Sequence, residues 1–144
     1  MKRFLILVSV VLLGFASFAK PAEGLSKDVL LQFDGYNVVW NTLSTTGSLE
    51  SMPLGNGDIT VNAWVEKDGD LMLYLGKSDA WAESTRLLKV GRVRVRLSPN
   101  PFDGTESYVQ ALRLADGKLN ITARSKEIRC DLSVWVDANS PAVH

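Results

Sequence analysis

Six carboxylates in the middle of the chain are the first candidates for chemistry, because a pair of acidic side chains roughly 5–10 Å apart can hydrolyse a glycosidic bond. Asp68 and Asp70 flank a hairpin glycine, and we expect both to be solvated turn residues. Asp79 and Glu83 would share a face if their segment were helical, and surface hydrogen bonds are their favoured role. We therefore predict no catalytic residue in this sequence. The six carboxylates are Asp58, Glu66, Asp68, Asp70, Asp79 and Glu83.

Other side chains with catalytic or metal-binding chemistry are scarce. His144 is the single histidine and the last residue, and Cys130 is the single cysteine. These counts argue against histidine-based catalysis, a cysteine zinc cluster and an intramolecular disulfide, so we predict no metal site and no cofactor. The chain has 16 basic and 16 acidic residues. Such a balance gives no long-range attraction to a phosphate backbone, and we expect no nucleic-acid partner.

Tryptophan and arginine side chains are candidates for binding rather than catalysis. Trp64 and Trp135 fall on the nominally outer faces of their strands, where a tryptophan can contact another domain, form a sugar platform or pack at an edge. The contact with another domain is the favoured interpretation. Arg92, Arg94 and Arg96 alternate along one strand, which favours a solvated face over an interdomain or acidic-ligand contact. The tryptophans are Trp40, Trp64, Trp81 and Trp135.

The beginning of the chain is typical of a secretory leader. Met1–Ala19 combines two basic residues, an apolar run and small residues before a cut at Lys20. The apolar run is shorter than the roughly twenty residues of a membrane-spanning helix. We therefore predict a signal peptide over 1–19, a lead-in segment over 20–35 that is flexible over Pro21–Lys27, no stable membrane span, and a secreted or periplasmic location.

Period-two alternation of apolar and polar residues dominates the rest of the chain. Asp58–Val65, Arg92–Leu97, Lys118–Ala123 and Ile128–Asp137 each gather their aliphatic residues on one face, which indicates half-buried antiparallel strands. Only Ser78–Lys89 could hold a helix, with an ordered loop as the alternative. About seven short strands at roughly ten-residue spacing predict an all-β antiparallel sandwich over 36–144.

Ser51–Asp58 is the most distinctive segment, because its proline and two glycines allow a sharp turn into the following strand. A plain tight turn explains it on spacing alone. In the order Trp40, Met52–Asp58, a hairpin and Leu73–Trp81, however, the chain resembles the N-terminal domain of glycoside hydrolase family 95, the α-L-fucosidase family, and its uncharacterised bacterial relatives. Departures after the motif and at 76–79 make it more similar to a sister family than to a true fucosidase.

The resemblance implies an N-terminal super-sandwich domain packed on an (α/α)6 barrel that carries the catalytic residues. No catalytic residue transfers to this sequence, and the residues nearest the barrel mouth would be Asn56, Asp58, Asp79 and Trp81. A new apolar stretch after the turn at Asp137–Pro141 predicts that the sandwich is truncated and that more chain follows. The expected partners are then the downstream catalytic domain and an oligosaccharide. The alternatives are a free-standing carbohydrate-binding or adhesion module and a structural cell-envelope domain.

Overall fold

The computed structural model describes residues 26–144. The predicted signal peptide over 1–19 lies outside the described residues. Within the predicted lead-in segment, Lys27–Asp34 forms the helix α1, which the sequence had not indicated. Ser26 caps this helix by accepting a hydrogen bond from the backbone N–H of Val29 at 3.4 Å. Within 26–144 no helix has the length and apolar character needed to cross a membrane.

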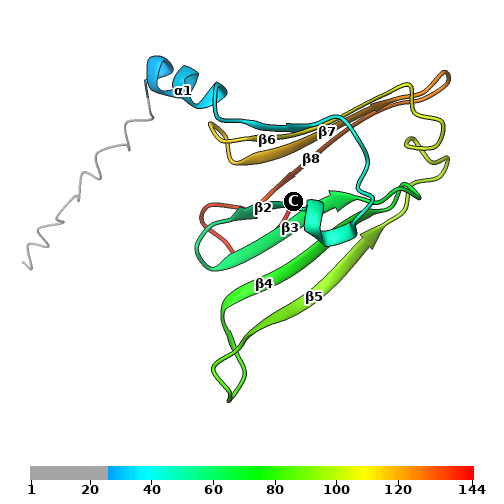
Figure 1. The fold of residues 1–144 in the computed structure, drawn as a ribbon. Coiled ribbons are helices and arrows are strands. Elements are labelled where there is room, and N and C mark those ends of the chain that lie inside the picture. Colours follow the sequence, from blue (N-terminus) through cyan, green and yellow to red (C-terminus); the bar gives the residue numbers. More distant parts are fainter. Residues whose placement is uncertain (1–25) are drawn as a thin grey trace, which may run out of the picture.

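Two four-stranded antiparallel sheets form the body of the domain, which confirms the predicted all-β sandwich (Figure 1). The first sheet has the order β1-β6-β7-β8, and the second has the order β2-β3-β4-β5. A short 3-10 helix, η1 (Gly47–Glu50), lies against β3. The strands are β1 (Val38–Trp40), β2 (Met52–Gly55), β3 (Ile59–Val65), β4 (Leu71–Trp81), β5 (Leu87–Val95), β6 (Ser107–Arg113), β7 (Lys118–Arg124) and β8 (Arg129–Trp135).

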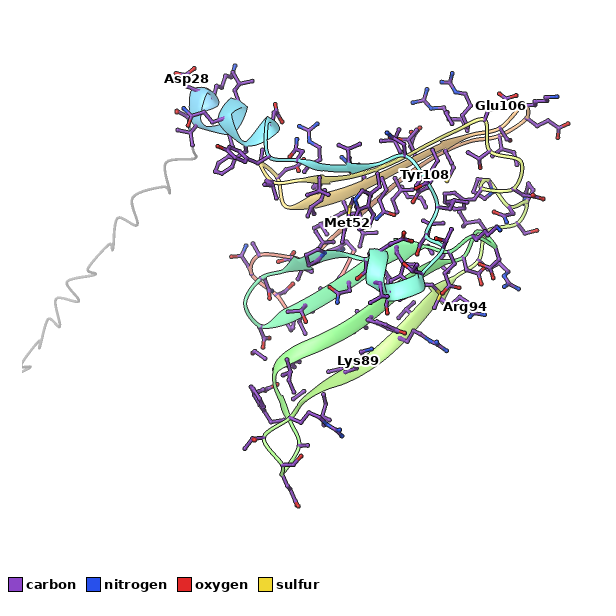
Figure 2. All side chains as sticks on the ribbon, in the orientation of Figure 1. Asp28, Met52, Lys89, Arg94, Glu106 and Tyr108 are labelled. Atoms are coloured by element: carbon purple, nitrogen blue, oxygen red, sulfur yellow. The ribbon has the colours of Figure 1, made fainter. Side chains whose placement is uncertain are left out.

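The core lies between the sheets, where the period-two pattern placed it. Leu119, Ile121 and Ala123 from β7 are fully buried against aliphatic residues of β3 and β4. Met52 and Tyr108 point from opposite sheets into the same space (Figure 2). Full burial of one leucine or isoleucine contributes roughly 1.5–3 kcal/mol, so these strand faces supply much of the stability of the sandwich.

The segment Ser78–Lys89 is neither a helix nor an irregular loop. It forms the outer half of a long hairpin in which Trp81 of β4 pairs with Leu87 of β5, and the turn closes with the N–H of Ala82 donating to the carbonyl of Arg86 at 2.9 Å. The hairpin projects away from the sandwich (Figure 1). Because Leu87 and Leu88 are exposed there, a helix would have found no core to bury its apolar face, while the two strands pair again at Trp81 and Leu87 after an irregular stretch.

The predicted outward tryptophans are also placed differently. Trp64 is only 2% exposed and packs edge-on against Tyr74 with ring centroids 4.8 Å apart, so it can be neither a sugar platform nor an exposed interface residue. Trp135 is half-buried, stacks on His144 at 5.0 Å, and has the Nζ of Lys118 4.8 Å from its ring centroid. Both outer faces are therefore partly covered by the chain itself, which strand alternation cannot reveal.

Candidate functional site

Asn56 joins two turns that are far apart in the sequence. Its Oδ1 accepts hydrogen bonds from the N–H groups of Asp58 at 2.9 Å and Ile59 at 2.8 Å. Its Nδ2 donates to the carbonyls of Asp137 at 2.8 Å and Ser140 at 3.2 Å. The next residue, Gly57, has φ +93°, a conformation that favours glycine.

These four hydrogen bonds use the amide of Asn56 completely. Two of them close the β2–β3 turn, and two attach that turn to the corner 137–140, which follows β8 in the other sheet. The structure thus gives Asn56 backbone partners where the resemblance implied a position at the mouth of a catalytic barrel. The distinctive Ser51–Asp58 segment thus attaches the β2–β3 turn of one sheet to the corner that follows β8 of the other sheet.

The three other predicted site residues are linked along the projecting hairpin: Lys77 joins Asp58 and Asp79 at its base, and Trp81 stands at the outer end of β4. The Nζ of Lys77 lies 3.0 Å from Oδ1 of Asp58 and 2.7 Å from Oδ2 of Asp79. Ser78 donates its hydroxyl to Asp58 at 3.3 Å and accepts, at its carbonyl, the indole N–H of Trp81 at 2.8 Å. We call Asp58, Lys77, Ser78, Asp79 and Trp81 the Lys77 cluster.

The electrostatics of the Lys77 cluster favour binding over proton transfer. Lys77 donates hydrogen bonds to Asp79 and to Asp58, which raise the pKa of Lys77 in that order of importance, and the hydrogen bond from Lys77 lowers the pKa of Asp79. A general acid working near neutral pH needs a carboxyl whose pKa is raised instead. The cluster therefore presents fixed charges beside an indole ring that is 57% exposed.

A shallow pocket of about 170 Å³ lies at the base of the same hairpin, between β3, β4 and β5. Its lining includes Thr60 and Tyr74, and the Nζ of Lys89 lies 3.9 Å above the centre of the Tyr74 ring. Gly76 permits this close arrangement, because a Cβ there would meet the hydroxyl of Thr60 at 2.6 Å. The pocket thus combines hydroxyl and aromatic groups next to the Lys77 cluster.

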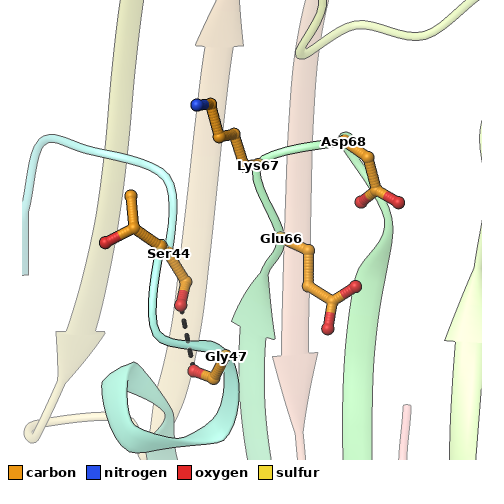
Figure 3. A pocket seen from close by; sticks show the side chains of 6 residues that line it. Ser44, Gly47, Glu66, Lys67 and Asp68 are labelled. Atoms are coloured by element: carbon orange, nitrogen blue, oxygen red, sulfur yellow. Dashed lines mark hydrogen bonds between the residues drawn. The ribbon is translucent and has the colours of Figure 1, made fainter.

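A second pocket, of about 290 Å³, lies between the loop before η1 and the β3–β4 turn (Figure 3). Ser44 lines it and is held by its hydroxyl, which donates to the carbonyl of Gly47 at 2.9 Å. Glu66 and Asp68 also line it. Among residues 26–144, no group of three or more histidine, cysteine, aspartate or glutamate side chains is arranged to hold a metal ion.

The sequence analysis missed one buried ion pair. Asp70 is 1% exposed and accepts two hydrogen bonds from Arg96, from Nε at 2.8 Å and from Nη2 at 2.7 Å. The Nε of Arg94 lies 3.3 Å from the same carboxylate. The hydrogen bonds of Arg96 lower the pKa of Asp70. Asp70 is therefore not a solvated turn residue, and two arginines of the predicted solvated row neutralise a buried carboxylate. An Asp-Gly-Asp turn carries no local signal of this long-range pairing.

Comparison with known proteins places these features in a family. Residues 39–144 match DUF5703_N, described as a domain of unknown function (DUF5703). No curated protein and no solved structure matches the chain. The match begins within β1 and runs through β8, so it includes both sheets and both pairs of residues that Asn56 connects. It provides no link to glycoside hydrolase family 95. The chain therefore belongs to the DUF5703_N family of N-terminal domains, which here is a β-sandwich.

Proposed function

We propose that this domain is the non-catalytic N-terminal sandwich of a secreted, glycoside hydrolase-like protein that acts on carbohydrate. Its task is to pack against a downstream catalytic domain of the same chain and to support that domain near the sugar. The observation that carries the proposal is the projecting β4–β5 hairpin, which exposes Trp81 together with Leu87 and Leu88 beyond the sandwich.

Contiguous exposed apolar side chains with a polar rim are typical of an interface. Trp81 is an effective anchor for such a contact, because an indole buries a large apolar area at a low entropic cost. The charged groups of Asp58, Lys77 and Asp79 beside it supply the polar rim. The predicted leader over 1–19 and the match to an N-terminal domain family support the secreted location and the order of domains.

Calorimetry on the longer gene product tests the domain contact. The variant Trp81→Ala should separate the unfolding of the sandwich from that of the downstream domain. Leu49→Ala is the matched control, because Leu49 is 86% exposed on η1, away from the hairpin. Equal effects of the two variants, or a stop codon directly after His144, would remove the proposal. Hydrolysis of a panel of aryl glycosides by the longer protein tests its carbohydrate part.

A free-standing carbohydrate-binding module is the second candidate. It is favoured by the exposed ring of Trp81 lying beside fixed charged groups, an arrangement that can stack a sugar and bind its hydroxyls. Titration calorimetry of this chain against a panel of glycans tests it. Binding that disappears in Trp81→Ala and persists in Leu49→Ala supports the module, and no heat with any glycan contradicts it.

A further inference from the structure

Strand β5 is the longest unprotected sheet edge in the described part of the chain. It ends the order β2-β3-β4-β5 and has 9 residues, whereas the edge strands β1 and β2 have 3 and 4. The fourth edge strand, β8, has 7 residues, and its last residue, Trp135, already exchanges backbone hydrogen bonds of 3.0 and 2.9 Å with His144. The N–H and C=O groups on the outer side of β5 have no comparable neighbouring strand, and such groups form a template for pairing.

The inner face of the second sheet is incomplete at this edge. Val93 pairs with Leu73 and points to the same side, toward the other sheet. Leu73 is buried, yet Val93 is 40% exposed. Val90, at the irregularity in the β4–β5 pairing, is 60% exposed. One further strand beside β5 would cover these valines and extend the buried face.

The charges of β5 indicate what kind of strand can bind there. Its ionisable residues are Lys89, Arg92 and Arg94, and all are basic. Lys89 is occupied by the ring of Tyr74 and Arg94 by Asp70, while Arg92 is exposed and free to face a partner. A second copy of β5 paired antiparallel about Val93 would set Arg92 opposite Arg94 twice, and like charges directly opposite destabilise a pair of strands.

We propose that β5 is a docking edge for an extended segment in which acidic and apolar residues alternate. The segment adds a fifth strand to the second sheet, buries its apolar residues beside Val93, and sets its carboxylates opposite the basic residues on the outer face. Backbone hydrogen bonds supply affinity that does not depend on the sequence of the segment. Arg92 makes an acidic segment bind more tightly than a basic one. This inference concerns the strand edge and does not rest on the sugar-related function proposed above.

Two synthetic peptides of about eight residues test the proposal, because the affinity of an added strand depends both on its backbone hydrogen bonds and on the charge of its side chains. One alternates valine with glutamate, and the other alternates valine with lysine. Fluorescence anisotropy at low ionic strength should show about tenfold tighter binding of the glutamate peptide, as expected when an opposite-charge pair at Arg92 replaces a like-charge pair. Added salt should reduce that preference. Amide hydrogen exchange should slow in 87–95 when the glutamate peptide is bound.

Arg92→Glu is the diagnostic variant, because Arg92 is exposed and its replacement leaves the contacts of Asp70 and Tyr74 intact. It should reverse the preference between the peptides. Arg124→Glu is the matched control, an exposed arginine on the central strand β7, and should leave the preference unchanged. Failure of both peptides to bind at millimolar concentration overturns the proposal. Equal binding of the two peptides, protection at another edge, or concentration-dependent self-association through β5 also overturns it.

Discussion

Replacing Asn56 by aspartate is the sharpest test of the link between the two turns. The variant keeps Oδ1, which accepts from the N–H groups of Asp58 and Ile59, but it removes the donor to the carbonyls of Asp137 and Ser140. A carboxylate oxygen then lies against two carbonyl oxygens. Each net hydrogen bond contributes about 0.5–1.5 kcal/mol. We therefore expect Asn56→Asp to lower the free energy of unfolding by about 1–3 kcal/mol.

Asn56→Ala removes all four hydrogen bonds, which sum to about 2–6 kcal/mol. Water reaches this half-buried site and replaces part of the loss, so we expect about 2–4 kcal/mol, more than for aspartate. Urea unfolding followed by tryptophan fluorescence measures both variants. Asn62→Asp is the matched control, because Asn62 is exposed on β3, and it should change stability by less than about 0.5 kcal/mol.

Amide exchange separates the loss of this link from general destabilisation. In Asn56→Asp the corner 137–140 should open more readily, so exchange should quicken at Asp137, whose N–H donates to the carbonyl of Ala142 at 2.9 Å. Ile121→Val destabilises the core by about 0.5–1.5 kcal/mol without touching the corner and should not show this local effect. If Asn56→Asp matches the wild-type protein in stability and exchange, the structural role assigned to Asn56 is wrong.

Three further outcomes are expected. Tyr108→Phe removes the hydroxyl that donates to Oε1 of the buried Gln110 at 2.7 Å, and it should lower the free energy of unfolding in urea by about 1–3 kcal/mol. Adding Gln110→Leu should restore part of this loss, because the double variant no longer buries an unpaired amide oxygen. Asp70 has a pKa below its ordinary 3.8 in the folded chain, so its ion pair stabilises the fold above about pH 4 and is lost as the pH falls further; Asp70→Asn should flatten the acid limb of a plot of Tm against pH. Leu119→Ala should cost about 2–5 kcal/mol by thermal or urea unfolding, because Leu119 is fully buried in the core.

Strand positions and inner faces could be predicted because burial of one side of a sheet makes apolar and polar residues alternate along the sequence of each strand. The aliphatic sets of β3 and β7 are buried as their alternation indicated. The helix α1 was missed because its eight residues bury no side chain in the core and are too few to give a strong helical pattern besides the Ser26 cap. Local pattern thus identifies elements that face the core and overlooks those that do not.

The remaining errors concern contacts between segments distant in the sequence. Trp64 was expected to be exposed because strand alternation assigns a residue to one face of the sheet but does not show whether other parts of the chain bury that face. Asp70 was expected in solvent because its partner Arg96 lies 26 residues further along the chain. Conversely, Asp58, Asp79 and Trp81 were grouped by resemblance alone, and the structure brings them together through Lys77 and Ser78, neither of which had been singled out as a site residue.

The two roles found for the Ser51–Asp58 segment are physically connected. Asn56 holds the corner 137–140 with its amide nitrogen and the N–H of Asp58 with its amide oxygen, and the carboxylate of Asp58 lies 3.0 Å from Lys77 at the base of the hairpin. A continuous polar path therefore runs from the turn after β8 to the exposed hairpin on the other sheet. We therefore expect a disturbance of the corner to shift Asp58 and, through Lys77, the base of the projecting hairpin. On this geometry Asn56 is a positioning residue for the Lys77 cluster, and its replacement should weaken any binding that depends on Trp81 even though Asn56 touches no partner.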